Sequence, residues 1–176
     1  MVTEAGFAPY EYTKTTGAGV VNKVAGVDVD MMMLFCEEYN YKLDLLDIEF
    51  KTIPTKVNES ANYVGAAGMT ITAEREEVVD FAVPYIQTKQ YIISDTANSF
   101  KTIAELKGKK IGAQESTPGD FLLADEVEAG VLKDSNATVK TYEKVMVAFQ
   151  DLLAGKLDAI VIDEFVAKGL VANYSK

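Results

Sequence analysis

One short stretch, residues 65 to 85, contains the residue types and the spacing from which an anion-binding site can be built. Thr72 stands where a helix N-cap is expected, and the residues after it predict one or two helical turns. Arg75 then falls in the first turn, where a cation opposes the helix dipole and needs compensation. If the backbone N–H groups around Thr70 are free, they converge with two threonine hydroxyls and the guanidinium on one spot. Such a spot suits a carboxylate or a phosphate.

A second interpretation of Arg75 needs no ligand. Acidic residues surround it in the sequence, so its guanidinium can form surface ion pairs with Glu74, Glu76, Glu77 or Asp80. Exposed pairs of this kind are common and need no function. The spacing alone leaves both interpretations open.

The composition excludes several classes of protein. With 176 residues, of which 48% are hydrophobic, the chain can build a packed core. A net charge of −10 without a run of Lys or Arg argues against nucleic acid as a partner. The absence of His removes the usual general base and the commonest zinc ligand. We therefore expect neither a metal or other cofactor nor enzymatic activity.

The beginning of the chain predicts an export signal that is already removed. No apolar run approaches the ~18 residues of a membrane span, and no signal peptide is recognisable. Met1 is followed directly by the strand-like pair Val2-Thr3. The single cysteine, Cys36, permits no intrachain disulfide, and we expect it to be a buried small hydrophobe.

The first half of the chain predicts strands that alternate with helices. A strand at Val2-Thr3 precedes a helix over residues 27–39, a strand over 42–50, a helix that starts at residues 53–55 with Pro54 in its first turn, and a strand of small residues, continuing from Tyr63, that ends near residue 71. Asp28 and Asp30 open the first helix, where they suit its dipole better than they suggest metal ligands. Such alternation predicts a largely parallel sheet, whose ligands lie beyond the carboxyl ends of the strands.

A second alternation follows an extended, β-prone stretch over residues 85–94. Its predicted strands are 110–114, 138–142 and 158–163, and its helices begin near residues 117, 145 and 164. Thr117 has the position of a helix N-cap with Pro118 at the first helical position. Asp163 lies at the last strand-to-helix junction, where it can act as an N-cap or receive an ammonium group.

The segment Ala67 to Arg75, with Val79-Asp80-Phe81 and Pro84-Tyr85 after it, resembles the signature of the polar amino-acid solute-binding proteins of bacterial ABC importers. Residues 156–164 also match, and the resemblance covers nearly the whole chain. It implies an α/β, two-lobed clamshell of the type II periplasmic-binding-protein fold, with mostly parallel sheets flanked by helices. We expect lobe 1 at residues 1–88, a crossing strand at 89–95 and lobe 2 at 96–176. Family members continue for several dozen residues, so the return segment of lobe 1 is expected to be missing.

The same resemblance implies the roles of individual residues. The α-carboxylate of an amino acid would be bound by Arg75, helped by Thr70 and the region of Thr117. The α-ammonium would be bound by Asp163, together with the Gly68 carbonyl and Glu4. The ligand side chain would lie between Phe7 and Phe50. No one amino acid is favoured by this mixture of residue types.

The implied function is capture of a free polar L-amino acid between two lobes and its delivery to the membrane permease of an ABC importer. The implied location is outside the cytoplasm, in the periplasm or on the cell surface as a lipoprotein. Two alternatives remain at this point. The chain can be the sensor domain of a receptor or kinase, or a lyase that resembles cyclohexadienyl dehydratase, for which Glu4 and Glu115 are the candidate acids.

Overall fold

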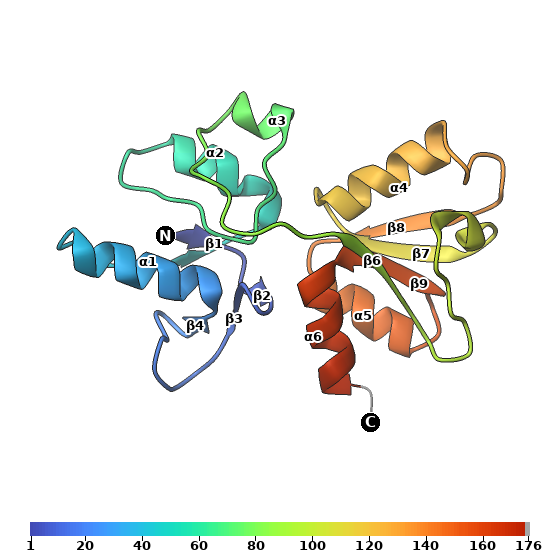
Figure 1. Ribbon diagram of the computed structural model, residues 1–176, viewed down its shortest axis with the longest axis horizontal. Coiled ribbons are helices and arrows are strands. Elements are labelled where there is room, and N and C mark those ends of the chain that lie inside the picture. The colour runs from blue at the N-terminus through green and yellow to red at the C-terminus, as the bar shows by residue number, and fades with distance from the viewer. Residues whose placement is uncertain (175–176) are drawn as a thin grey trace. The chain divides into compact units, whose positions relative to one another are not determined.

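The computed structural model describes residues 1–174, which fold into two compact units, Met1–Gln87 and a second unit that begins at Thr88 (Figure 1). Both units combine strands with helices, which confirms the predicted α/β class. None of the helices in the described residues has the length and apolar character to span a membrane. Each unit is described on its own below.

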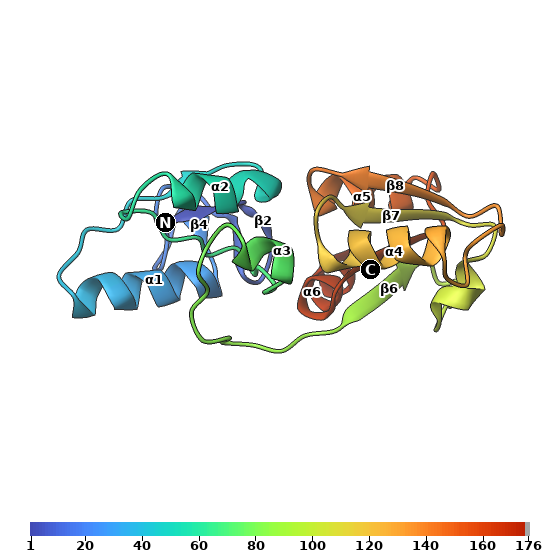
Figure 2. The same ribbon diagram turned by 90° about the horizontal axis from the view of Figure 1, so that it is seen from above.

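The first unit is built around β1 (Val2–Thr3), which pairs in parallel with β5 (Leu46–Asp47). On the other side of β1, Val2 donates a backbone N–H to Val64 and accepts one from Ala66, at 2.8 and 3.1 Å. Successive side chains of an extended chain point to opposite faces, so Met1 and Val2 contribute to different cores. Helices α1 (Val27–Glu38) and α2 (Ile53–Asn58) lie on opposite sides of it (Figure 2).

Apolar side chains form a separate cluster under each of these helices. Under α1 they are Met1, Ala5, Val24, Val29 and Leu45. Under α2 they are Val2, Phe50, Ile53 and Ala67. A small antiparallel sheet in the order β2 (Gly6–Phe7), β3 (Glu11–Thr13) and β4 (Val24–Ala25) leads into α1.

Two predicted strands of this unit are wrong in extent. Of residues 42–50 only β5 is a strand, because its partner β1 offers just two residues for pairing. The predicted strand of small residues forms a single bridge, Val2 to Gly65, and its backbone then turns at Gly68, where φ is +54°. The chain leaves the sheet at that point, which frees the next residues for other contacts.

The second unit contains a four-stranded sheet in the order β6-β9-β7-β8. Strand β7 is parallel to both of its neighbours, whereas β6 runs antiparallel to β9 at the edge. The strands are β6 (Gln90–Ser94), β7 (Lys110–Gln114), β8 (Thr138–Tyr142) and β9 (Ala159–Asp163). A 3₁₀ helix, Ile103–Leu106, precedes β7 and begins with a capping box between Thr102 and Glu105.

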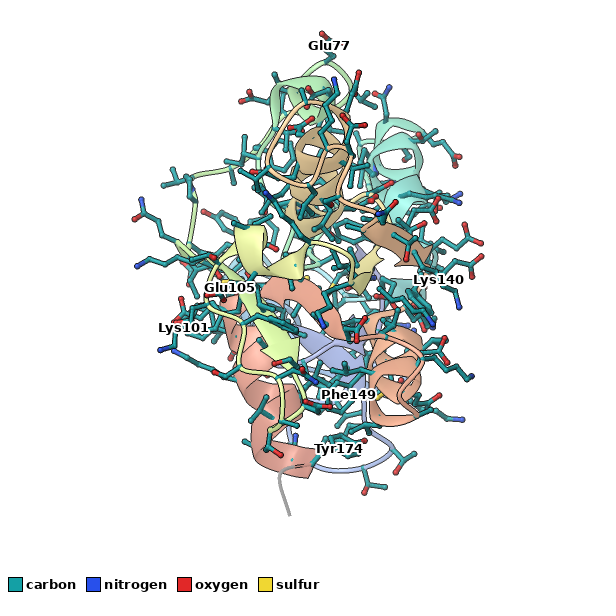
Figure 3. All side chains as sticks on the ribbon, turned by 90° about the vertical axis from the view of Figure 1, so that its right-hand side faces the viewer. Glu77, Lys101, Glu105, Lys140, Phe149 and Tyr174 are labelled. Carbon is teal, nitrogen blue, oxygen red and sulfur yellow. The ribbon has the colours of Figure 1, made fainter. Side chains whose placement is uncertain are left out.

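Helices cover both faces of this sheet. Helix α4 (Pro118–Glu128) lies on one face, and α5 (Val145–Leu153) and α6 (Glu164–Tyr174) lie on the other (Figure 1). The core under α4 includes Leu123, Ile111 and Val161, each buried. On the opposite face, the rings of Phe149 and Tyr174 join α5 to α6, with their centroids 5.2 Å apart (Figure 3).

Candidate functional site

The predicted anion site begins with a one-turn helix, α3 (Ala73–Glu76). Thr72 is its N-cap, and its hydroxyl accepts the backbone N–H of Arg75 at 3.3 Å, as the sequence predicts. Within the described residues, the backbone N–H groups of Met69, Thr70 and Ile71 donate to no protein acceptor. These N–H groups therefore remain available to a bound anion.

Arg75 is the single arginine of the chain, and its side chain is buried, with 9% of the residue exposed. Its guanidinium carbon lies 5.2 Å from the centroid of the Phe50 ring, and its Nη1 donates to the carbonyl of Thr70. Burial lowers the pKa of the guanidinium from its ordinary value, although an arginine remains charged in proteins. The interpretation of Arg75 as part of an exposed surface ion pair does not fit this burial.

Gly68 turns the chain toward Thr70 and Arg75. A Cβ at this position would lie 3.1 Å from the Tyr10 ring and 3.3 Å from the Phe7 ring, and the positive φ disfavours other residues as well. The Gly68 N–H donates to a carboxylate oxygen of Asp28 at 2.8 Å. The position therefore favours glycine, beside two aromatic rings that stack with centroids 5.9 Å apart.

Glu4 follows β1 directly and is almost fully buried, with 1% of the residue exposed. Its carboxylate lies close to Gly6, since a Cβ there would lie 2.7 Å from Oε1. It also faces the buried Glu11, whose pKa it helps to raise. Glu4 therefore belongs to a buried acidic group behind the loop that carries Phe7.

The structure thus brings together most of the predicted residues of the first unit. Arg75 contacts both Phe50 and Thr70, and Gly68 packs against Phe7. Phe50 follows β5, Phe7 lies in β2 after β1, and the other three lie in the segment after the Gly65 bridge. This is the edge at which ligands of α/β sheets bind.

The two predicted residues of the second unit lie at the carboxyl ends of neighbouring strands, β7 and β9. Thr117 is the N-cap residue of α4, but its hydroxyl donates to the Gln114 carbonyl at 2.7 Å instead of capping. The Ser116 N–H is accepted by Asp120. Asp163 accepts the backbone N–H of Phe165 at 2.9 Å, so it acts as an N-cap, one of its two expected roles.

Sequence reasoning missed the residues that support Gly68. The sequence predicts for Asp28 only a capping and dipole role at the start of its helix, yet its carboxylate accepts from Gly68 and also from the Tyr85 hydroxyl, each at 2.8 Å. Glu11 is fully buried beside it. The only local signal was an acid at the start of a helix and a second acid in an apolar stretch, because the contacts themselves join residues 40 and 57 positions apart.

Comparison with known proteins identifies a matching family over most of the chain. Residues 1–164 match the profile of the bacterial extracellular solute-binding proteins, family 3. Among curated proteins, the chain is 31% identical over 162 residues to the L-arginine-binding protein of Pseudomonas aeruginosa, covering 91% of this chain and 58% of that protein. It is 27% identical over 177 residues to a probable histidine-binding protein of Neisseria gonorrhoeae, covering 100% and 61%. The chain therefore spans about three fifths of the length of such relatives.

Solved structures give the same assignment of fold. An ancestral arginine-binding protein bound to arginine superposes with a TM-score of 0.88 at 31% identity, over 99% of this chain and 74% of that one. The holo arginine-binding protein of T. maritima superposes with a TM-score of 0.85 at 29% identity, over 99% and 72%. Both comparisons support the type II periplasmic-binding-protein fold expected from the sequence.

Proposed function

The chain belongs to family 3 of the bacterial extracellular solute-binding proteins, and on that premise we propose that it captures a free polar L-amino acid for an ABC importer. One relative is named as an arginine-binding protein of an ABC transporter. No catalytic step is needed for this role. The protein binds its ligand and releases it unchanged to a membrane permease.

Arg75 is the observation that carries the proposal. Only 9% of the residue is exposed, and its guanidinium lies against the Phe50 ring, so a buried cation is held at this position. A guanidinium fork binds the α-carboxylate of an amino acid with two parallel hydrogen bonds. Three backbone N–H groups at residues 69–71 and the start of α3 favour an anion at the same place.

The remaining contacts of the ligand are proposed from the family resemblance. In the first unit, the Gly68 carbonyl and Glu4 bind the α-ammonium, Thr70 helps Arg75, and Phe7 and Phe50 flank the side chain. In the second unit, Asp163 binds the ammonium and the region of Thr117 binds the carboxylate. The burial of Asp163 and Thr117, at 8% and 5% exposed, supports specific roles for both.

We propose a basic amino acid, with L-arginine first, as the ligand to test. Relatives that match nearly the whole chain are named for arginine or histidine. One of the similar structures holds arginine and another holds glutamine.

The place of action that we propose is outside the cytoplasm, as a periplasmic protein or a lipid-anchored protein at the cell surface. This follows from the membrane permease as partner, since an importer receives its substrate on the outer side of the membrane.

Isothermal titration of the chain with individual L-amino acids, L-arginine first, tests the proposal. We expect saturable heat that is lost in Arg75→Ala. Lys101→Ala removes an exposed cation of the second unit and is the matched control (Figure 3). If the wild-type chain is folded by circular dichroism but no L-amino acid produces heat or raises its melting temperature, the proposal is wrong.

A further inference from the structure

Asp28 connects three parts of the first unit that are far apart in sequence. It is the second residue of α1 and has 0% exposed surface. One carboxylate oxygen accepts the Gly68 N–H and the other accepts the Tyr85 hydroxyl, both at 2.8 Å. Its own backbone N–H donates to the Tyr10 carbonyl at 3.0 Å.

The two residues that Asp28 binds are the ends of the segment that carries Arg75. Between Gly68 and Tyr85 the only regular structure is the single turn of α3. Such a segment has little intrinsic order, and its conformation depends on how its ends are held. Through Gly68 and Tyr85, one carboxylate fixes both ends of the segment and therefore the direction of the backbone at Thr70.

Glu11, the first residue of β3, is a second buried acid next to Asp28. It is fully buried beside Asp28, and within the described residues neither of its carboxyl oxygens accepts a hydrogen bond from an N–H or O–H group. Burial, and then the neighbouring Asp28, raise the pKa of Glu11 well above its ordinary value, with a smaller contribution from Glu4. A protonated Glu11 removes one of the two buried charges, and its O–H can donate to Asp28.

Asp28 is better suited than Glu11 to carry the charge. Although burial raises its pKa, hydrogen bonds from Gly68, Tyr85 and Glu11 favour its carboxylate form. It also lies in the first turn of a helix, where the dipole favours an anion. Burial raises the pKa of Tyr85 too, and Asp28, Glu11 and Tyr10 add to that effect, so the tyrosine keeps the proton that it donates.

We propose that Asp28 is a positioning residue for the amino-acid site, which holds the Gly68–Tyr85 segment in the conformation that presents Thr70 and Arg75, with Glu11 as its neutral hydrogen-bond donor. The inference rests on the proposed function for its effect on binding. The positioning itself can be observed without any ligand. Asp28 does not contact the ligand in this proposal and acts through Gly68 and Tyr85.

The chain offers a direct probe of the position of Arg75. Because Arg75 is the only arginine, its Nε–H gives a single side-chain resonance in a ¹⁵N spectrum, separate from all others of its type. The Gly68 amide reports on the hydrogen bond to Asp28 through its hydrogen-exchange rate. Neither readout requires a bound amino acid.

Each variant changes one hydrogen-bonding group of the set formed by Asp28, Tyr85 and Glu11. Asp28→Asn keeps the shape but removes the charge and replaces one acceptor by a donor, so Gly68 loses a charged acceptor, and the Gly68 N–H and the Tyr85 hydroxyl can no longer each donate to an oxygen of their own. Tyr85→Phe removes one hydroxyl with no change of charge, and Tyr91→Phe, whose hydroxyl binds Glu164 in the second unit, is its matched control. Glu11→Gln replaces the proposed neutral acid by a neutral donor of the same shape.

We expect Asp28→Asn to speed exchange of the Gly68 amide by about tenfold or more, since the acceptor of its hydrogen bond is no longer charged. We expect Asp28→Asn and Tyr85→Phe both to shift the Arg75 Nε resonance and to weaken L-arginine binding, at temperatures where each variant is fully folded. Glu11→Gln should leave the Gly68 exchange rate and the affinity within about threefold of the wild type, because its amide still donates to Asp28. Tyr91→Phe should change none of these.

Other outcomes overturn the inference. An unchanged Arg75 resonance in both Asp28→Asn and Tyr85→Phe excludes positioning by Asp28, and if Asp28→Asn does not fold, Tyr85→Phe alone decides. A Glu11→Gln variant that behaves like Asp28→Asn excludes the neutral-donor role. If the wild-type chain binds no L-amino acid but the resonance of Arg75 still moves in these variants, the proposed function fails and the positioning of Arg75 by Asp28 stands.

Discussion

The guanidinium carbon of Arg75 lies 5.2 Å from the centroid of the Phe50 ring, with both side chains buried. Phe50 precedes α2 and Arg75 belongs to α3, so this contact connects two separate segments of the candidate site. A cation over an aromatic face is stabilised by about 0.5–2 kcal/mol, more when it is desolvated. The ring therefore helps to orient the guanidinium before any ligand arrives.

Replacing Phe50 by Leu should weaken binding of L-arginine by about 0.5–2 kcal/mol, because the apolar volume is largely kept while the cation–π contact is lost. Isothermal titration measures the change. Phe100→Leu is the control, since Lys109 lies over the Phe100 ring at 5.5 Å in the second unit, outside the proposed ligand contacts. Equal losses in both variants would contradict a specific role for the Phe50 ring.

Gly26 allows α1 to start against the loop before β3. Its φ is +141°, and a Cβ there would lie 2.1 Å from the Tyr10 carbonyl oxygen, which is backbone and cannot move aside. Gly26→Ala should therefore destabilise the protein by more than the ~1 kcal/mol typical of an unfavourable backbone conformation alone. Urea unfolding followed by circular dichroism measures the loss.

Gly155→Ala is the comparison for that variant. Its φ is +69°, but nothing lies within 4 Å of the added Cβ, so only the backbone conformation opposes the change. We expect a loss of about 1–2 kcal/mol. If the two alanine variants are equally stable, the close approach at Gly26 has no energetic importance.

The raised pKa of Glu11 predicts how stability depends on pH. The folded protein binds the Glu11 proton more tightly than the unfolded chain, in which the pKa is near 4.5. This contribution to stability is complete below pH 4.5 and is lost as the pH rises toward the folded pKa. Glu11→Gln cannot lose a proton, so its free energy of unfolding should decrease less than that of the wild type over this range.

Unfolding curves of the wild type and Glu11→Gln at several pH values test this expectation. Their difference reports on Glu11 together with Asp28, because the two groups titrate as a pair. A difference that is independent of pH above 4.5 would mean that Glu11 is already ionised in the folded protein.

Leu123 should make a large contribution to the stability of the second unit. It is 0% exposed and packs between α4 and the sheet with Ile111 and Val161. Leu123→Ala should cost about 2–5 kcal/mol, through lost apolar contact and the cavity left behind. Leu153→Ala, at a position in α5 that is 61% exposed, should change stability by no more than about 0.5 kcal/mol.

Predictions from the sequence were most accurate for long strands and helices, whose periodicity and capping residues lie within the element itself. The strands of the second unit and helices α4, α5 and α6 lie where their periodicity and capping residues placed them. In the first unit the strands are two or three residues long and are defined by their partners. Such strands have no period of their own, so residues 42–50 and 63–71 were predicted as longer strands than the structure contains.

The family resemblance also predicted which residues form the site. It assigned Arg75, Thr70, Gly68, Phe7 and Phe50 to one site, and the structure places these residues in two adjoining groups of contacts. Their contacts with an amino acid remain proposals that the titrations above test.

By itself, the sequence determined the family, the α/β class and the one-turn helix capped by Thr72 that carries Arg75, because each depends on residues close together in the chain. Only the tertiary structure decided that Arg75 is buried against Phe50, and that Asp28 holds Gly68 and Tyr85. Hydrogen bonds and burial between residues 25 to 57 positions apart leave no periodic signal in a sequence. They arise when the folded chain brings β1, α1 and the segment after Gly65 together.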